Sequence, residues 1–90
     1  MSDARINVGA TGLVFAILLG GWHLFWSALV ATGLAQEFAD FIFWIHFIKP
    51  VYVIEPFEIG RASILVLVTA TIGFVAGVGV AWVWNGLHKR

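Results

Sequence analysis

His23 is the ionisable residue that lies deepest within an apolar stretch of this sequence. Ionisable side chains inside membrane spans are rare and are functional candidates by default. A neutral imidazole at this position has three candidate roles: a hydrogen bond to Thr69, Ser27 or a backbone carbonyl, axial ligation of a haem or chlorophyll, and proton relay. We expect the first role, in helix packing, without a cofactor; a tetrapyrrole on His23 is the alternative. A bis-histidine haem within one chain is not expected, because His46 falls in the connector and His88 in the C-terminal tail.

Other reaction chemistry lacks its residues. Every Asp and Glu lies outside the two long charge-free stretches, so the mid-membrane carboxylate of a proton-driven rotor subunit is missing. The sequence has no cysteine, which excludes disulfides, thiolate metal sites and a thiol nucleophile. No Ser/His/Asp set, phosphate-binding glycine loop or hydrolytic carboxylate pair is recognisable. We therefore expect neither enzymatic activity nor a metal site.

The composition indicates a membrane protein of one domain. Of the 90 residues, 61% are hydrophobic and 11% are charged, whereas a soluble domain carries about 25% charged residues. A chain this short could not bury so much apolar surface in a core of its own. Five Lys and Arg balance five Asp and Glu, which leaves no basic surface for nucleic acid. The expected surroundings are therefore a lipid bilayer.

Each of the two charge-free stretches is long enough to cross a bilayer, which takes about 20 residues. They predict an all-α membrane protein: a hairpin of two transmembrane helices at residues 8–34 and 59–85, with a connector at residues 36–58. Between residues 38 and 48, apolar side chains at helical spacing form a stripe of Phe38, Phe41, Ile42, Ile45 and Ile48. This stripe predicts an aromatic helix at the membrane interface. The alternative is that the first helix continues past the headgroups.

Boundary signals flank both spans. Gly33-Leu34-Ala35 has the form of a signal-peptide cleavage site, but the preceding apolar stretch is far longer than a signal core, so we expect a retained helix. Pro50 ends any helix and predicts an extended piece at residues 51–54. Pro56 places the start of the second span nearby.

Small residues recur at helical spacing in both spans and predict a packing face. In the first span they share one face with His23, and in the second they include two glycines four positions apart. The predicted packing residues are Gly9, Gly12, Ala16, Gly20, Ser27 and Ala31 in the first span, and Thr69, Ala70, Gly73, Gly77 and Ala81 in the second. The face serves either the hairpin itself or docking to another protein.

Aromatic side chains and positive charges suggest how the hairpin sits in the membrane. We expect Trp44, Tyr52, Trp82 and Trp84 to anchor it at the interfaces. The terminal segments carry three Lys and Arg, whereas two, Lys49 and Arg61, lie in the connector and directly after it. This bias favours cytoplasmic termini.

Three segments of the chain form a pattern found in a known family. They are Gly20-Gly21-Trp22, Pro50-Val51-Tyr52, and the glycine-rich run from Gly73 to Gly77 that leads to Trp84-Asn85. By these segments the chain resembles an uncharacterised family of small bacterial two-helix membrane proteins. The charged connector and the lack of an acidic residue in the glycine run depart from the family pattern. The resemblance implies a two-helix fold in the inner membrane of a bacterium and no assigned activity.

Three functions fit these features. The first is a non-catalytic accessory subunit that docks by its small-residue faces onto a larger membrane complex, such as a respiratory or photosynthetic one. The second is a haem- or chlorophyll-binding protein that uses His23, although single-span antenna polypeptides place a small residue where this sequence has Leu19. The third is a self-assembling, holin-like pore formed by a homo-oligomer.

Overall fold

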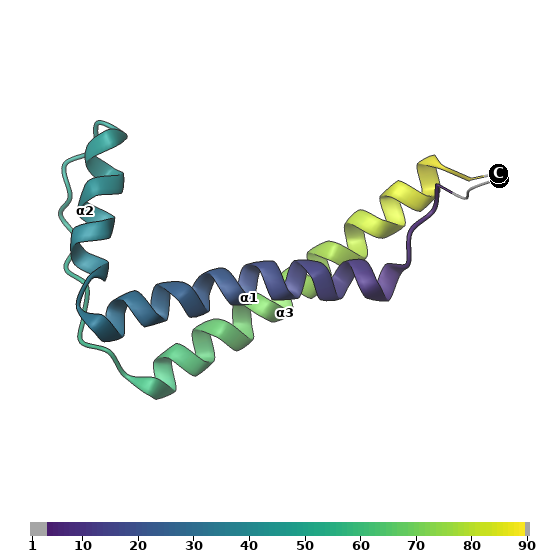
Figure 1. Ribbon diagram of the computed structural model, residues 1–90. Helices are drawn as coiled ribbons and strands as arrows, with labels where there is room; N and C mark the ends of the chain where they lie inside the picture. Colours follow the sequence, from purple (N-terminus) through teal and green to yellow (C-terminus); the bar gives the residue numbers. More distant parts are fainter. Residues whose placement is uncertain (1–3, 90) are drawn as a thin grey trace.

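The protein folds as two long helices that cross, with a short helix between them (Figure 1). This computed structural model describes residues 4–89, and within them the elements are α1 (Val8–Thr32), α2 (Ala35–Ile45) and α3 (Ile59–Leu87). The described residues contain no strand. Helices α1 and α3 are both long and apolar enough to cross a membrane. The all-helical prediction with two candidate spans is therefore confirmed.

Local capping fixes both ends of α1. Asn7 accepts a hydrogen bond from the backbone N–H of Ala10 at 2.7 Å and thereby caps the first turn. At the other end Gly33 has a φ of 83°, and the next N–H, that of Leu34, donates back to Leu29 O at 3.0 Å. This left-handed closure, which glycine adopts at little cost, ends the helix. The alternative of a first helix that runs on past the headgroups is therefore wrong.

Helix α2 begins and ends three residues earlier than the expected segment at 38–48. At the C-terminal end of the helix, Phe43 O accepts hydrogen bonds from both His46 N at 3.0 Å and Ile48 N at 2.9 Å. Phe47 sits between them with a φ of 62°. The chain thus reverses without a glycine, and Ile48 lies outside the helix instead of extending its apolar stripe. No residue-type signal for a turn marks this position.

Helix α3 begins three residues after Pro56, which lies in the extended segment that leads into it. It ends two residues beyond the expected boundary at 85. With a rise of about 1.5 Å per residue, its 29 residues exceed the roughly 30 Å of a bilayer core. The helix can therefore cross at a tilt, as its crossing with α1 requires.

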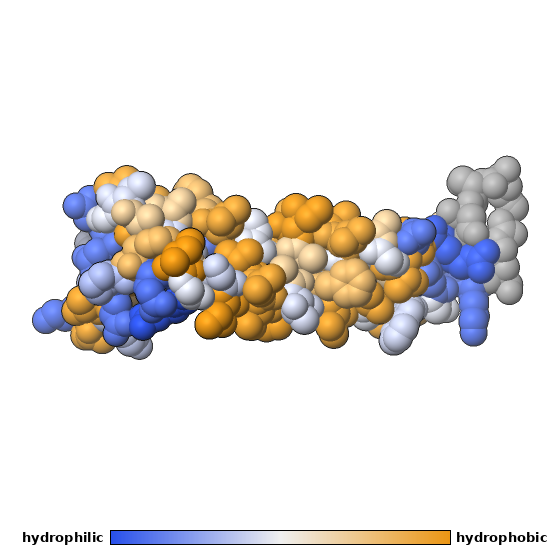
Figure 2. Space-filling view, turned by 90° about the horizontal axis from the view of Figure 1, so that it is seen from below, coloured by the Kyte–Doolittle hydropathy of each residue, from blue (hydrophilic) through white to orange (hydrophobic). Residues whose placement is uncertain are grey.

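Apolar and polar side chains are separated along the length of the molecule (Figure 2). Hydrophobic residues gather over the middle, and hydrophilic ones gather at both ends. Helix α2 lies across the connector end of α1 (Figure 1). Its Phe38 ring meets Trp26 of α1 edge-on at a centroid distance of 6.5 Å. The other members of the expected apolar stripe within α2 stay open, since Phe41, Ile42 and Ile45 are 56%, 36% and 46% exposed.

Candidate functional site

The glycines of α3 let the two backbones touch at the crossing. A Cβ built at Gly73 would lie 2.5 Å from Phe15 O, and one built at Gly77 would lie 2.6 Å from Thr11 O. Both obstacles are backbone atoms of α1, which cannot rotate away. Only glycine fits at these two positions. Both are among the predicted packing residues, and both lie where the two backbones come into contact.

The remaining small residues divide into those inside the crossing and those outside it. A Cβ at Gly20 would meet Ala70 Cβ at 3.0 Å, and one at Gly73 would lie 3.1 Å from Ala16 Cα. Gly12, Gly20 and Ser27 of α1 are buried, as are Gly73, Gly77 and Ala81 of α3. Thr69 and Ala70 are half-buried, whereas Gly9 and Ala31 are exposed and take no part in the contact.

His23 makes its hydrogen bond within α1, not across to α3. Its Nδ1 lies 2.7 Å from Leu19 O, and its own carbonyl accepts from Ser27 Oγ at 2.9 Å. Thr69 bonds instead to Leu65 O at 2.8 Å in its own helix. Of the partners considered from the sequence, a backbone carbonyl is therefore the one observed, and the inter-helix bond to Thr69 is wrong.

The tautomer set by this contact bears on ligation. With Nδ1–H donated to Leu19 O, Nε2 carries the lone pair that a haem or chlorophyll metal would take. His46 and His88 make the same contact four residues back, at 2.6 and 2.8 Å, so it does not single out His23. Among the described residues, no group of three or more His, Cys, Asp or Glu is placed to hold a metal ion.

A clamp that the sequence analysis missed joins the start of the chain to the end of α3. Asn85 accepts from Ile6 N at 2.7 Å and donates from Nδ2 to Ile6 O at 2.9 Å. Beside it, the indole N–H of Trp84 donates to Ala4 O at 2.6 Å. Trp84 also stacks on His88 at a centroid distance of 4.1 Å. Trp84 is thus held by contacts within the protein.

A second missed residue, Gln36, ties the connector to α2. Its Oε1 accepts from Ile54 N at 2.6 Å, and its Nε2 donates to Tyr52 O at 3.0 Å and to Asp40 Oδ1 at 2.9 Å. Tyr52 also packs its ring against Phe43 at 5.9 Å. The Gln36 side-chain amide therefore bonds the backbone of the extended residues at Tyr52 and Ile54, as a neighbouring strand would in a sheet. The other expected anchors, Trp44, Tyr52 and Trp82, remain largely exposed.

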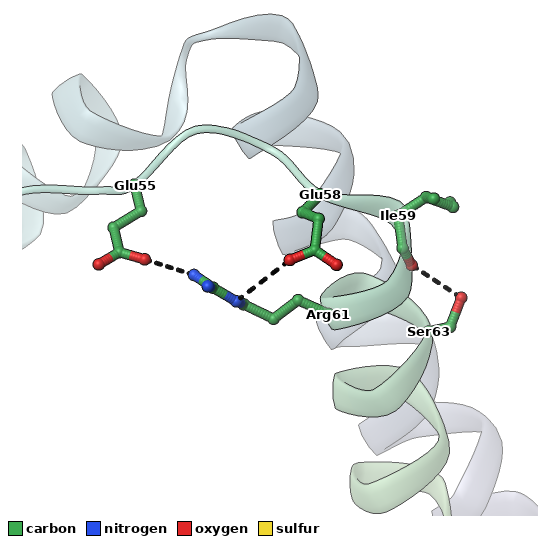
Figure 3. Close-up of polar contacts among 5 residues, drawn as sticks. All are labelled: Glu55, Glu58, Ile59, Arg61 and Ser63. Carbon is green, nitrogen blue, oxygen red and sulfur yellow. Dashed lines mark hydrogen bonds and ion pairs between the residues drawn. The ribbon is translucent and has the colours of Figure 1, made fainter.

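Charge gathers where the connector enters α3 (Figure 3). The Arg61 guanidinium pairs with the Glu55 carboxylate and lies 3.9 Å from the Glu58 carboxylate. All three side chains are about two-thirds exposed, at 65%, 67% and 62%. The cluster holds two anions and one cation at the end of the apolar band.

The outer face of α1 has a shallow hollow of about 510 Å³ around Gly21. Its walls are Ile17, Leu18, Trp22 and Phe25. A Cβ at Gly21 would meet nothing within 4 Å, unlike one at the neighbouring Gly20. Gly21 is therefore a small residue that the hairpin itself does not use.

Comparisons with known protein families, curated proteins and solved structures find no match to this chain. The resemblance to a family of two-helix membrane proteins stays a prediction from its motifs.

Proposed function

We propose that the protein is a non-catalytic structural subunit of a bacterial membrane complex, docked to a neighbouring transmembrane helix through the outer face of α1. The observation that carries this proposal is the hollow at Gly21. Glycine inside a helix costs about 1 kcal/mol relative to alanine. At Gly73 that cost is offset by close packing within the hairpin, whereas at Gly21, as at Gly79, no contact within the chain offsets it. Gly21 differs from Gly79 in that it lines the hollow.

The walls of the hollow suit a helix surface as the occupant. Ile17, Leu18, Trp22 and Phe25 are each more than half exposed, and the Trp22 and Phe25 rings lie 5.8 Å apart. Helices associate in lipid chiefly by close packing at small residues, because lipid tails are as apolar as the side chains. A side chain of a facing helix would seat between these walls over Gly21.

Helix α2 would complete the docking surface at the interface. We place its aromatic side chains at the headgroup level, where amphipathic rings are favoured. Phe38 holds α2 to Trp26 of α1, which leaves Phe41, Ile42 and Ile45 exposed for a neighbour. The lateral helix would then cover the end of a neighbouring bundle.

Gentle extraction from native membranes, followed by size and mass analysis, tests the proposal. We expect this chain in a particle with other subunits at a fixed ratio, and we expect Gly21→Leu to release it. Ala28→Leu is the matched control, because Ala28 is exposed on the same side of α1 but does not line the hollow. A particle that contains only this chain would refute docking and favour the self-assembling pore.

A second function, tetrapyrrole binding, is favoured by where His23 lies. Three histidines contact the carbonyl four residues back, and of these His23 is the one inside a helix long and apolar enough to cross a membrane. The Nδ1 contact with Leu19 O presents Nε2 in the form that ligates a tetrapyrrole metal. An absorption spectrum of the purified native particle decides it. A Soret or chlorophyll band that is lost in His23→Ala and kept in His88→Ala would establish ligation, and a spectrum without such a band would exclude it.

A further inference from the structure

A cavity of about 320 Å³ lies between the end of α1, the start of α3 and the extended residues that lead into α3. It exists because α1 and α3 meet at their glycines and separate toward the connector (Figure 1). Its inner lining is apolar and includes Trp26, Val30 and Leu65. Its rim includes Glu55, Glu58 and Arg61.

The rim has one charge more than it can pair internally. Arg61 bonds Glu55 directly, whereas Glu58 stands 3.9 Å from the guanidinium (Figure 3). Glu58 is also the residue before α3, yet its side chain makes no capping bond to the first turn. Arg61 thus pairs with both carboxylates, which leaves one net negative charge, and the 62% exposed Glu58 carboxylate can accept from a second cation. The remaining guanidinium N–H groups and the first-turn N–H groups favour an anion.

The position of the cavity defines the shape of its ligand. The rim residues Glu55, Glu58 and Arg61 lie where the connector enters α3, and the lining residues Trp26, Val30 and Leu65 belong to the two long helices. A ligand that fills it must be apolar at one end and carry both charges at the other.

We propose that this cavity binds an aminophospholipid headgroup together with the first part of its acyl chain. The primary ammonium would donate to Glu58, the phosphate would accept from Arg61, and the chain would pack against Trp26, Val30 and Leu65. A choline headgroup has no N–H to donate. A glycerol headgroup carries no cationic group, so the lipid would offer nothing to pair with the Glu58 carboxylate. The site thus discriminates among lipids by headgroup.

Lipid retention by the purified chain tests the proposal without any partner complex, so it is independent of the docking proposed above. The chain in detergent is offered equal amounts of lysophosphatidylethanolamine, lysophosphatidylcholine and lysophosphatidylglycerol with the same acyl chain, and bound lipid is counted by native mass spectrometry. We expect retention of the ethanolamine lipid to exceed that of each other lipid by about fivefold, the factor that one charge-assisted hydrogen bond near a surface contributes.

Two pairs of variants locate the binding. Glu58→Gln should abolish the preference, while Glu37→Gln makes the same charge change away from the cavity and should keep it. Ala62→Phe should fill the cavity and reduce retention of all three lipids, whereas Ser63→Phe, which is exposed and outside the lining, should not.

Three results would overturn the proposal. One is equal retention of the three lipids by the unaltered chain. Another is an equal loss of preference in Glu58→Gln and Glu37→Gln. The third is displacement of bound lipid by soluble glycerophosphoethanolamine at matching concentration, since a site for the free zwitterion would not require the acyl chain.

Discussion

The contact between Gly73 and Phe15 gives the sharpest test of the fold. In Gly73→Ala the new methyl carbon would lie 2.5 Å from Phe15 O, 2.9 Å from Phe15 C and 3.1 Å from Ala16 Cα. An ordinary carbon–oxygen contact is about 3.4 Å, so the backbones must separate by roughly 0.9 Å, which forfeits a quarter to a half of the dispersion energy at the crossing. Overpacking of this kind costs about 1–3 kcal/mol.

Gly79 provides a control on the same helix. A Cβ there meets nothing within 4 Å, so Gly79→Ala gains the same helix propensity, about 1 kcal/mol, without a clash. Propensity cancels in the difference between the two variants. We expect Gly73→Ala to be less stable than Gly79→Ala by about 1–3 kcal/mol.

Unfolding in mixed detergent micelles of increasing SDS fraction measures this difference. Because the chain has no cysteine, a dye pair on Ala10→Cys and Leu87→Cys reports separation of the helix ends by energy transfer. Both positions are exposed, so the labels leave the crossing intact. Equal midpoints for the two alanine variants would refute close backbone approach at Gly73.

Three further predictions concern the connector and the chain ends. Asn85→Leu should speed hydrogen exchange at Ile6 N, because it removes two hydrogen bonds worth about 1 kcal/mol each; exchange as slow as before would contradict the clamp. Gln36→Leu should speed hydrogen exchange at Ile54 N in the same way, and the helix content measured by circular dichroism should stay unchanged. A loss of helix content would show instead that Gln36 is needed for α2 to fold. Glu55→Cys should be labelled by an impermeant thiol reagent in intact cells, because cytoplasmic termini place the connector outside. Labelling only after permeabilisation would show the opposite orientation.

The parts of the fold that repeat along a helix could be predicted from sequence. The long apolar runs predicted α1 and α3, because a chain segment in lipid must satisfy its backbone hydrogen bonds internally, as a helix does. Gly73 and Gly77 were found because small residues four positions apart share one helix face. The spacing of small residues in α1 did not reveal that Gly9 and Ala31 lie beyond the crossing, because that depends on where the two helices diverge.

The contacts made by single side chains could not be predicted in this way. Asn85 and Ile6 are 79 positions apart, and an amide that bonds one backbone segment leaves no periodic trace. Gln36 is equally isolated, and Phe47 adopts its positive φ without a glycine. Gly33 offered a usable signal, a glycine directly after an apolar helix, but the sequence analysis weighed it as part of a cleavage motif.

The Asn85 clamp also makes the segment before α1 and the end of α3 depend on each other. It joins residues 79 positions apart, so it can close only when α1 and α3 have already crossed and brought Asn85 beside Ile6. A chain in which the two helices are apart leaves both amide groups of Asn85 and the backbone of Ile6 without these partners. Closure of the clamp thus reports that the crossing has formed.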